Sequence, residues 1–284
     1  MNTPEEISKS TTSNDSSSSF TARRSRRMLL KGAAGAAGVA GLAVAGAGIM
    51  SISPAYARFA RPDGETTVQQ NNLQYRTSQQ TADSIVDILT VARTAEQLAV
   101  TFYTNGVANA DKLGITGDNL AYLKAALVEE QIHQQFLAAN GGKSLADTFS
   151  FPQGPQTFTD LKTFIATQQQ LEGVFDSAYL AAIMEFAQLG RPDLAQIAGQ
   201  IATIESEHRA LGRAIGGLVP ADNWAFTPVL VTSVGAAPAL VQKAGYLSPM
   251  SGNSYTYQEV STSGAGVEQV KPFSMSAGTV VGNG

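Results

Sequence analysis

Four stretches of this chain repeat apolar residues every three or four positions, the pattern of helices with one buried face. The helices are expected from about residue 81, over 118–139, over 159–189, and after Gly190-Arg191-Pro192 to about Gly216. Asp118 is predicted to cap the second helix and Gly141 to end it. The first and third connections are short, about eight and three residues, so each joins antiparallel neighbours.

The connection between the second and third helices is long, at residues 140–158. An extended segment of about eighteen residues reaches about 60 Å, whereas a 22-residue helix is about 33 Å long. The third helix can therefore start parallel to the second. We predict an all-α four-helix bundle over residues 80–217 with one long crossover; an up-down bundle with a flexible middle loop is the alternative.

The first 57 residues carry the pattern of an export signal. Arg26 and Arg27, within residues 25–31, precede about twenty uncharged residues rich in Ala and Gly, and the run ends at Ala55-Tyr56-Ala57. The segment resembles a twin-arginine signal, which implies the twin-arginine export machinery as a partner. We expect a location outside the cytoplasmic membrane (periplasmic, cell-envelope or extracellular); a retained membrane anchor is the alternative.

Two further segments flank the predicted bundle. Residues 58–79 are polar and rich in Gln and Asn, and are expected to form an extended lead-in. Residues 218–284 contain Pro, Gly, Ser and scattered aromatic residues, and are predicted to be an irregular C-terminal extension. A short helix is expected near 236–244, with the rest as loop and short strand that either wraps on the bundle or stays mobile.

Charge and cysteine content exclude several functions. Residues 1–57 hold six of the 19 basic and three of the 23 acidic residues, so 13 basic and 20 acidic residues remain, a net charge of −7. An acidic chain is a poor partner for nucleic acid. The absence of cysteine excludes disulfides, iron–sulfur clusters and thiolate zinc sites.

The two histidines of the chain each follow a glutamate by three residues, as Glu130–His133 and Glu205–His208. Residues three apart share one face of a helix, and here that face is the apolar one. A buried carboxylate and imidazole cost several kcal/mol unless they are compensated, and a divalent metal is a common compensation. A core histidine bonded to a neighbouring glutamate is the simpler alternative.

The other two helices complete a repeated pattern. Glu96 and Glu172 lie on apolar stripes, and a tyrosine follows each by seven residues, at Tyr103 and Tyr179. The chain thus reads as two halves, each with Glu, Tyr and then Glu-x-x-His. Such a ligand set is found in dinuclear centres of helical bundles. The predicted metal ligands are Glu96, Glu130, His133, Glu172, Glu205 and His208.

One alternative concerns Glu129, which precedes His133 by four residues and can also face it. The fourth helix has Ile204 at the equivalent position, so the internal repeat favours Glu130 as the ligand.

The third and fourth helices carry further acidic residues near the predicted ligands. Asp176 lies one turn after Glu172 and is expected to support it, and either Asp176 or Glu185 can substitute for it. Glu185 and Glu207 are otherwise expected on solvated faces. Both tyrosines are expected to support the ligands or to pack, rather than to take part in redox chemistry.

On these residues, the segment 80–217 resembles the ferritin-like domain family, and more narrowly an exported bacterial branch akin to plant desiccation-related proteins. The resemblance implies two iron or manganese ions, with zinc as a substitute, and small oxidants such as dioxygen or peroxide. It implies Glu96 and Glu172 as terminal or bridging ligands, and a ferroxidase-like or catalase-like activity. Glu130 and Glu205 would bridge the ions, with His133 and His208 each bound to one ion.

Two other functions stay open on the sequence. One is a non-catalytic structural or stress-protective bundle, in which metal mainly fixes the fold. The other is iron storage in a closed homo-oligomeric shell, which the long C-terminal extension would obstruct.

Overall fold

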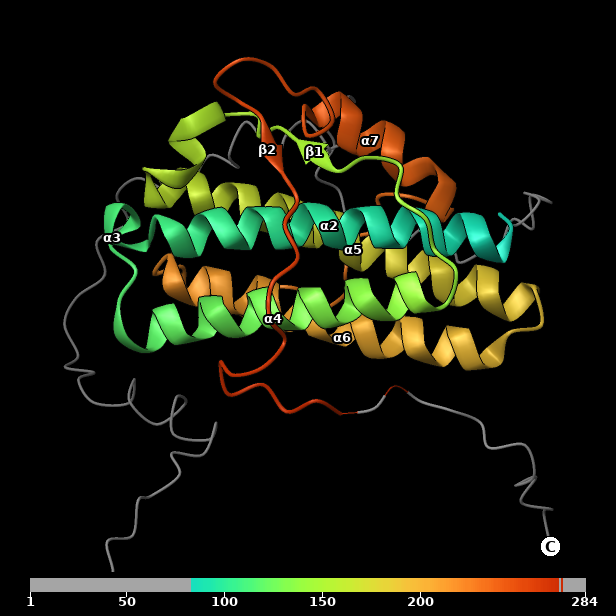
Figure 1. Ribbon diagram of the computed structural model, residues 1–284. Coiled ribbons are helices and arrows are strands. Elements are labelled where there is room, and N and C mark those ends of the chain that lie inside the picture. Colours follow the sequence, from blue (N-terminus) through green and yellow to red (C-terminus); the bar gives the residue numbers. More distant parts are fainter. Residues whose placement is uncertain (1–82, 271, 273–284) are drawn as a thin grey trace, which may run out of the picture. The chain divides into compact units, whose positions relative to one another are not determined.

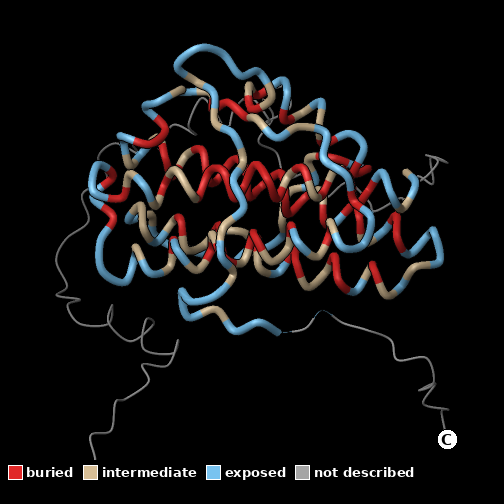
Figure 2. Tube along the Cα trace, viewed as in Figure 1, coloured by how far each residue is buried: buried red, intermediate tan, exposed pale blue. Residues whose placement is uncertain are grey.

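Four long helices lie side by side in the computed structural model, which describes residues 83–270 and 272 (Figure 1). They are α2 (Ile85–Ala108), α4 (Gly117–Ala139), α5 (Leu161–Gln188) and α6 (Pro192–Ile215). Their buried residues face one another inside the bundle (Figure 2). The predicted export signal at 1–57 and lead-in at 58–79 lie outside the described residues. No helix among residues 83–270 is both long and apolar enough to span a membrane.

The connections have the predicted order of short, long and short. A four-residue helix, α3 (Ala110–Leu113), turns the chain between α2 and α4, and three residues join α5 to α6. The long crossover contains β1 (Thr148–Phe149) and η2 (Gly154–Phe158). The crossover returns to the end of the bundle at which α4 begins, so α5 runs parallel to α4 (Figure 1). The all-α four-helix bundle with one long crossover is confirmed, and the up-down alternative is wrong.

Local signals set most helix ends. Ser84 Oγ accepts from the Asp87 N–H at 3.2 Å at the start of α2, and Asp160 Oδ1 accepts from the Thr163 N–H at 2.8 Å at the start of α5. Pro192 opens α6, where its missing N–H costs nothing.

The predicted cap of the second helix is wrong. Thr116 holds the N-cap position of α4, and Asp118 lies within the first turn, where its negative charge favours the helix N-terminus. The end of α4 follows the prediction. Gly141 adopts a φ of +97°, and the Gly142 N–H then donates to the carbonyl of Leu137 at 3.0 Å.

The extension after the bundle packs onto it over residues 218–260, whereas residues 261–270 are mostly exposed. It contains η3 (Val234–Ala236), α7 (Ala237–Ala244) and β2 (Tyr255–Thr256). Strand β2 pairs antiparallel with β1 in the crossover, with Thr148 opposite Thr256 and Phe149 opposite Tyr255. The extension is expected either to wrap on the bundle or to stay mobile, and most of its described part wraps on the bundle.

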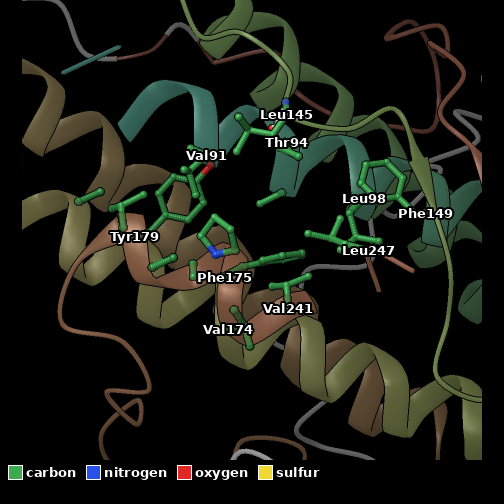
Figure 3. A pocket seen from close by; sticks show the side chains of 17 residues that line it. Val91, Thr94, Leu98, Leu145, Phe149, Val174, Phe175, Tyr179, Val241 and Leu247 are labelled. Atoms are coloured by element: carbon green, nitrogen blue, oxygen red, sulfur yellow. Dashed lines mark hydrogen bonds between the residues drawn. The ribbon is translucent and has the colours of Figure 1, made fainter. Parts of the chain in front are cut away.

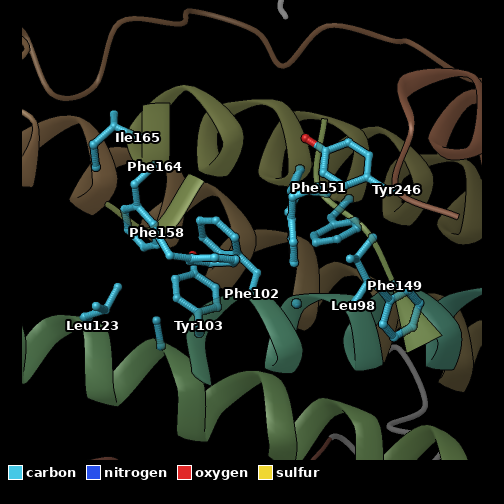
Figure 4. Close-up of a cluster of buried hydrophobic side chains, with 14 of the residues drawn as sticks. Leu98, Phe102, Tyr103, Leu123, Phe149, Phe151, Phe158, Phe164, Ile165 and Tyr246 are labelled. Carbon is cyan, nitrogen blue, oxygen red and sulfur yellow. The ribbon is translucent and has the colours of Figure 1, made fainter. Parts of the chain in front are cut away.

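An aromatic cluster joins α2, the crossover and α5 (Figure 4). Phe102 and Phe164 stack with ring centroids 4.5 Å apart, and Phe151 and Phe158 of the crossover pack edge-on to each other at 4.9 Å. Gly106 makes room for this packing, because a Cβ atom there would lie 2.6 Å from Phe164 Cε2. The cluster fixes the rotation of α2 about its axis. Tyr103, the residue after Phe102, therefore points into the centre of the bundle.

Glu185 corrects one expectation. The sequence placed it on a solvated face, but its side chain is buried and its Oε2 accepts from the Val234 N–H at 3.0 Å. The extension therefore covers this part of α5, and the carboxylate binds the first backbone N–H of η3. Because an isolated helical pattern contains no information about a later segment that covers it, the sequence showed only a polar position.

Candidate metal centre

The predicted ligands converge at the centre of the bundle, with at least one side chain from each long helix. Glu96 lies on α2, Glu172 on α5, and the two Glu-x-x-His pairs on α4 and α6. Two groups of four can each hold a metal ion, because one ligand atom from every member lies within 4.8 Å of the others. The groups are Glu96, Glu130, His133 and Glu205, and Glu130, Glu172, Glu205 and His208.

Glu130 and Glu205 belong to both groups, and each offers a different oxygen to each histidine. Glu130 Oε2 lies 3.6 Å from His133 Nδ1, while its Oε1 lies 3.0 Å from His208 Nδ1. Glu205 Oε1 lies 3.4 Å from His133 Nδ1, and its Oε2 lies 3.5 Å from His208 Nδ1. The two carboxylates therefore lie between the two imidazoles, which is the arrangement of bridging ligands.

The donor atoms of the cluster fit metal ions because they lack other partners. Despite these short separations, none of the inward-facing atoms makes a hydrogen bond within the described part of the chain. Buried polar atoms are almost always satisfied, so such a concentration calls for a compensating ligand. The atoms are one oxygen each of Glu96 and Glu172, both oxygens of Glu130 and Glu205, and Nδ1 of His133 and His208.

Electrostatics leads to the same conclusion. Burial, followed by the charges of Glu130 and Glu205, raises the pKa of both Glu96 and Glu172 well above the usual range. Four carboxylates cannot all ionise together in this interior without cations. Burial acts to lower the pKa of both histidines, but the surrounding carboxylates outweigh it and raise the pKa. The site stabilises positive charge among its carboxylates.

The two tyrosines cross between the halves of the repeat. The Tyr103 hydroxyl of α2 donates to Glu172 Oε1 of α5, and the Tyr179 hydroxyl of α5 donates to Glu96 Oε1 of α2. Burial and the neighbouring carboxylates raise the pKa of both tyrosines, which keeps the hydroxyls protonated as donors. Each tyrosine thus leaves only the other oxygen, Oε2, of its carboxylate free for a metal.

Gln168 supports Tyr103 from α5. Its Nε2 lies 3.1 Å from the Tyr103 hydroxyl and donates to the carbonyl of His208 at 2.6 Å. The amide reaches α6 because residue 212 is glycine: a Cβ atom at Gly212 would lie 1.8 Å from Gln168 Oε1. Sequence reasoning assigned Gln168 no role, because its approach to Gly212 is a contact between α5 and α6.

Glu129 lies beside the cluster but contacts the opposite histidine. Its Oε2 lies 2.8 Å from Nε2 of His208 on α6. Glu129 does not belong to either group that can hold a metal, so Glu130 is the clustered glutamate of α4, as the internal repeat favours. A carboxylate on the outer nitrogen of a metal-binding imidazole orients the ring and selects its tautomer.

Asp176 is expected to support Glu172, but it forms its hydrogen bond with a residue of α6 instead. Its Oδ1 accepts from the Ser206 hydroxyl at 2.8 Å, next to Glu205. Burial raises the pKa of Asp176 to about 6, and the bond from Ser206 works against this rise. Neither Asp176 nor Glu185 belongs to the groups that can hold a metal.

Comparison with known proteins agrees with the fold. The model of the ferritin-like domain family matches residues 84–217, the segment that contains all four long helices. No curated protein and no solved structure gives a significant match to the chain. The chain therefore carries a ferritin-like domain, which spans residues 84–217.

Proposed function

We propose that this protein is an exported ferritin-like protein with a dinuclear iron or manganese centre that serves oxygen- or peroxide-linked metal oxidation or detoxification. One observation supports two ions above all others. Glu130 and Glu205 each direct one oxygen toward His133 and the other toward His208, so two metal positions share both carboxylates.

The donor set favours iron or manganese. Glu96 and His133 would complete the ligands of one ion, and Glu172 and His208 those of the other. Oxygen and nitrogen donors without thiolate suit these metals, and zinc can fill such a site during preparation. Four carboxylates and two divalent ions balance in charge, which removes the repulsion that, after burial, raises the pKa of Glu96 and Glu172. A bound pair of such ions supplies two-electron chemistry with dioxygen or peroxide.

The export part of the proposal rests on residues 1–57. Arg26-Arg27, the uncharged run and the Ala55-Tyr56-Ala57 pattern support a twin-arginine signal. A paired Arg26→Lys, Arg27→Lys variant is expected to accumulate inside the cell, as measured by fractionation. Continued export of that variant would contradict the twin-arginine route.

The metal content of the purified protein tests the centre. Plasma mass spectrometry should find about two iron or manganese ions per chain after purification without chelator or added metal. A His133→Ala, His208→Ala double variant should lose most of this metal while keeping its helical circular dichroism. Little metal in the wild-type protein, with no uptake of added iron or manganese, would contradict the proposal.

A structural or stress-protective bundle is the second candidate. It is favoured by the origin of the ligands, because ions held by α2, α4, α5 and α6 together would tie the whole bundle. Turnover separates the two functions. Ferrous oxidation or peroxide consumption that is lost in Glu130→Ala supports the oxidoreductase, whereas metal-dependent stability without turnover supports the structural protein.

A further inference from the structure

A chamber of about 350 Å³ lies between α4 and α6, beside the carboxylate–histidine cluster. Glu129 and His133 are part of its lining, and its remaining walls are mostly apolar. Beyond β2 the chain crosses α4, where the Val260 N–H donates to Gln131 Oε1 at 3.0 Å (Figure 1). It then supplies one wall of the chamber through residues 267–270 and 272.

The two histidines differ in how their outer sides are covered. The His208 side chain is fully buried, and Glu129 holds its Nε2. The His133 side chain keeps 12% of its surface exposed and faces the chamber. In the internal repeat, Ile204 of α6 stands where α4 has Glu129. The chamber therefore occupies the place where exact symmetry would put a second carboxylate against His133, and Ile204 lines it.

The chemistry of the lining restricts what can fill this space. Nδ1 of His133 is directed at the carboxylates. When a metal ion binds Nδ1, Nε2 carries the proton and needs an oxygen acceptor. None of the described lining residues is Lys or Arg, and Glu129 and Glu268 both bring carboxylates. Repulsion by these carboxylates disfavours an anion. A neutral hydroxyl group satisfies both conditions, since its oxygen can accept from His133 and its proton can be donated to Glu129.

We propose that this chamber, lined by Ile132, Phe136, Ile201 and Ile204 with His133 and Glu129 as its polar end, binds a neutral, largely apolar small organic molecule through a hydroxyl group. The volume falls within the range of about 300–1,000 Å³ for small-molecule sites. The inference rests on the proposed metal centre, because metal binding by Nδ1 makes Nε2 of His133 a donor. It adds to that function a class of organic ligand located at the ion nearest His133.

A second cavity provides the control. It lies between α2, α5 and α7, measures about 60 Å³, and is lined by apolar side chains such as Leu98, Val174 and Val241 (Figure 3). Leu145 lines this cavity and is exposed, so a larger residue there can turn to solvent. The cavity is too small for an organic ring with a hydroxyl group.

Phenol is a suitable probe, with benzoate as an anionic molecule of similar shape. Isothermal titration of phenol into the metal-loaded full chain should show saturable binding at one site, at least about tenfold tighter than benzoate. Ile204→Trp fills the chamber, and Ile204→Glu supplies the missing carboxylate. Each should weaken phenol binding at least about tenfold, while Leu145→Trp should leave it unchanged.

Metal content measured on the same samples separates this inference from the proposed function. Absence of phenol binding by a wild-type chain that holds two ions would overturn the chamber inference and leave the metal centre standing. Equal binding of benzoate, or unchanged phenol binding in a folded Ile204→Trp variant, would also overturn it. A wild-type chain that cannot take up metal would contradict the proposed function itself, irrespective of whether phenol binds. If Ile204→Trp fails to fold, Ile204→Glu at the same half-exposed position still decides the matter.

Discussion

The hydroxyl of Tyr103 donates a hydrogen bond to the carboxylate of Glu172, although the two residues belong to different halves of the internal repeat. Tyr179 makes the equivalent bond to Glu96 in the opposite direction. Each half of the chain therefore holds a carboxylate of the other half in place. The cluster at the bundle centre depends on the packing of α2 against α5, and neither helix pair can form it alone.

Removing either crossing hydroxyl should weaken the metal site. Tyr103→Phe or Tyr179→Phe leaves a buried carboxylate oxygen without its donor, which costs about 1–3 kcal/mol. Metal affinity should fall about 10- to 100-fold, as measured by competition with a chelator. Tyr246→Phe is the matched control: it removes a buried tyrosine hydroxyl bonded to Gln170, and should lower stability but not metal affinity. Equal affinities in all three variants would show that the crossing bonds do not orient the ligands.

Glu129 should act on the metal through His208. Glu129→Ala removes the acceptor 2.8 Å from His208 Nε2 and should lower metal affinity about 10- to 100-fold. Glu129→Gln retains an amide oxygen that can accept the same bond, so its loss should be smaller. Asp118→Asn removes an exposed acid from the same helix and should leave metal affinity unchanged. An identical loss in Glu129→Gln and Glu129→Ala would point to the charge of Glu129 instead of its hydrogen bond.

Gly212 should be needed for the position of Gln168. The added Cβ of Gly212→Ala would lie 1.8 Å from Gln168 Oε1, so the amide must move away from Tyr103 and His208. Thermal denaturation should show a loss of about 1–3 kcal/mol. Gly199→Ala on the same helix meets only Ile183 Cδ1 at 3.8 Å, and should gain up to about 1 kcal/mol from helix propensity. A gain in both variants would show that the Gln168 side chain relocates without cost.

Asp176 should make the stability of the metal-free protein depend on pH. Its pKa is raised to about 6 in the folded state by burial, so ionisation opposes folding. This destabilisation is fully present above about pH 6 and disappears as the pH falls below about 4, where both states hold the proton. Asp176→Asn should therefore stabilise the metal-free protein by about 3 kcal/mol at pH 7.5 and have little effect near pH 4. Denaturant unfolding of both proteins at the two pH values measures the difference. A stabilisation by Asp176→Asn that is equal at the two pH values would rule out the charge of the carboxylate as its cause.

The sequence by itself determined the four helices, their connections and the identity of the clustered residues. These features follow from local rules: apolar residues at helical spacing, Pro192 at a helix start, Gly141 at a helix end, and the length of the crossover. The repeated Glu-x-x-His pairs were informative because a polar pair on an apolar helical face needs a partner inside the bundle.

Only the tertiary structure decided which atoms meet across the bundle. The bonds from Tyr103 to Glu172 and from Glu129 to His208 join residues 69 and 79 positions apart, and spacing along one helix contains no information about either. The burial of Glu185 and the chamber beside His133 likewise depend on the C-terminal extension, which has no repeating pattern. Helix formation is dictated by neighbours in sequence, whereas the partners of a buried polar side chain are set by the packing of whole helices.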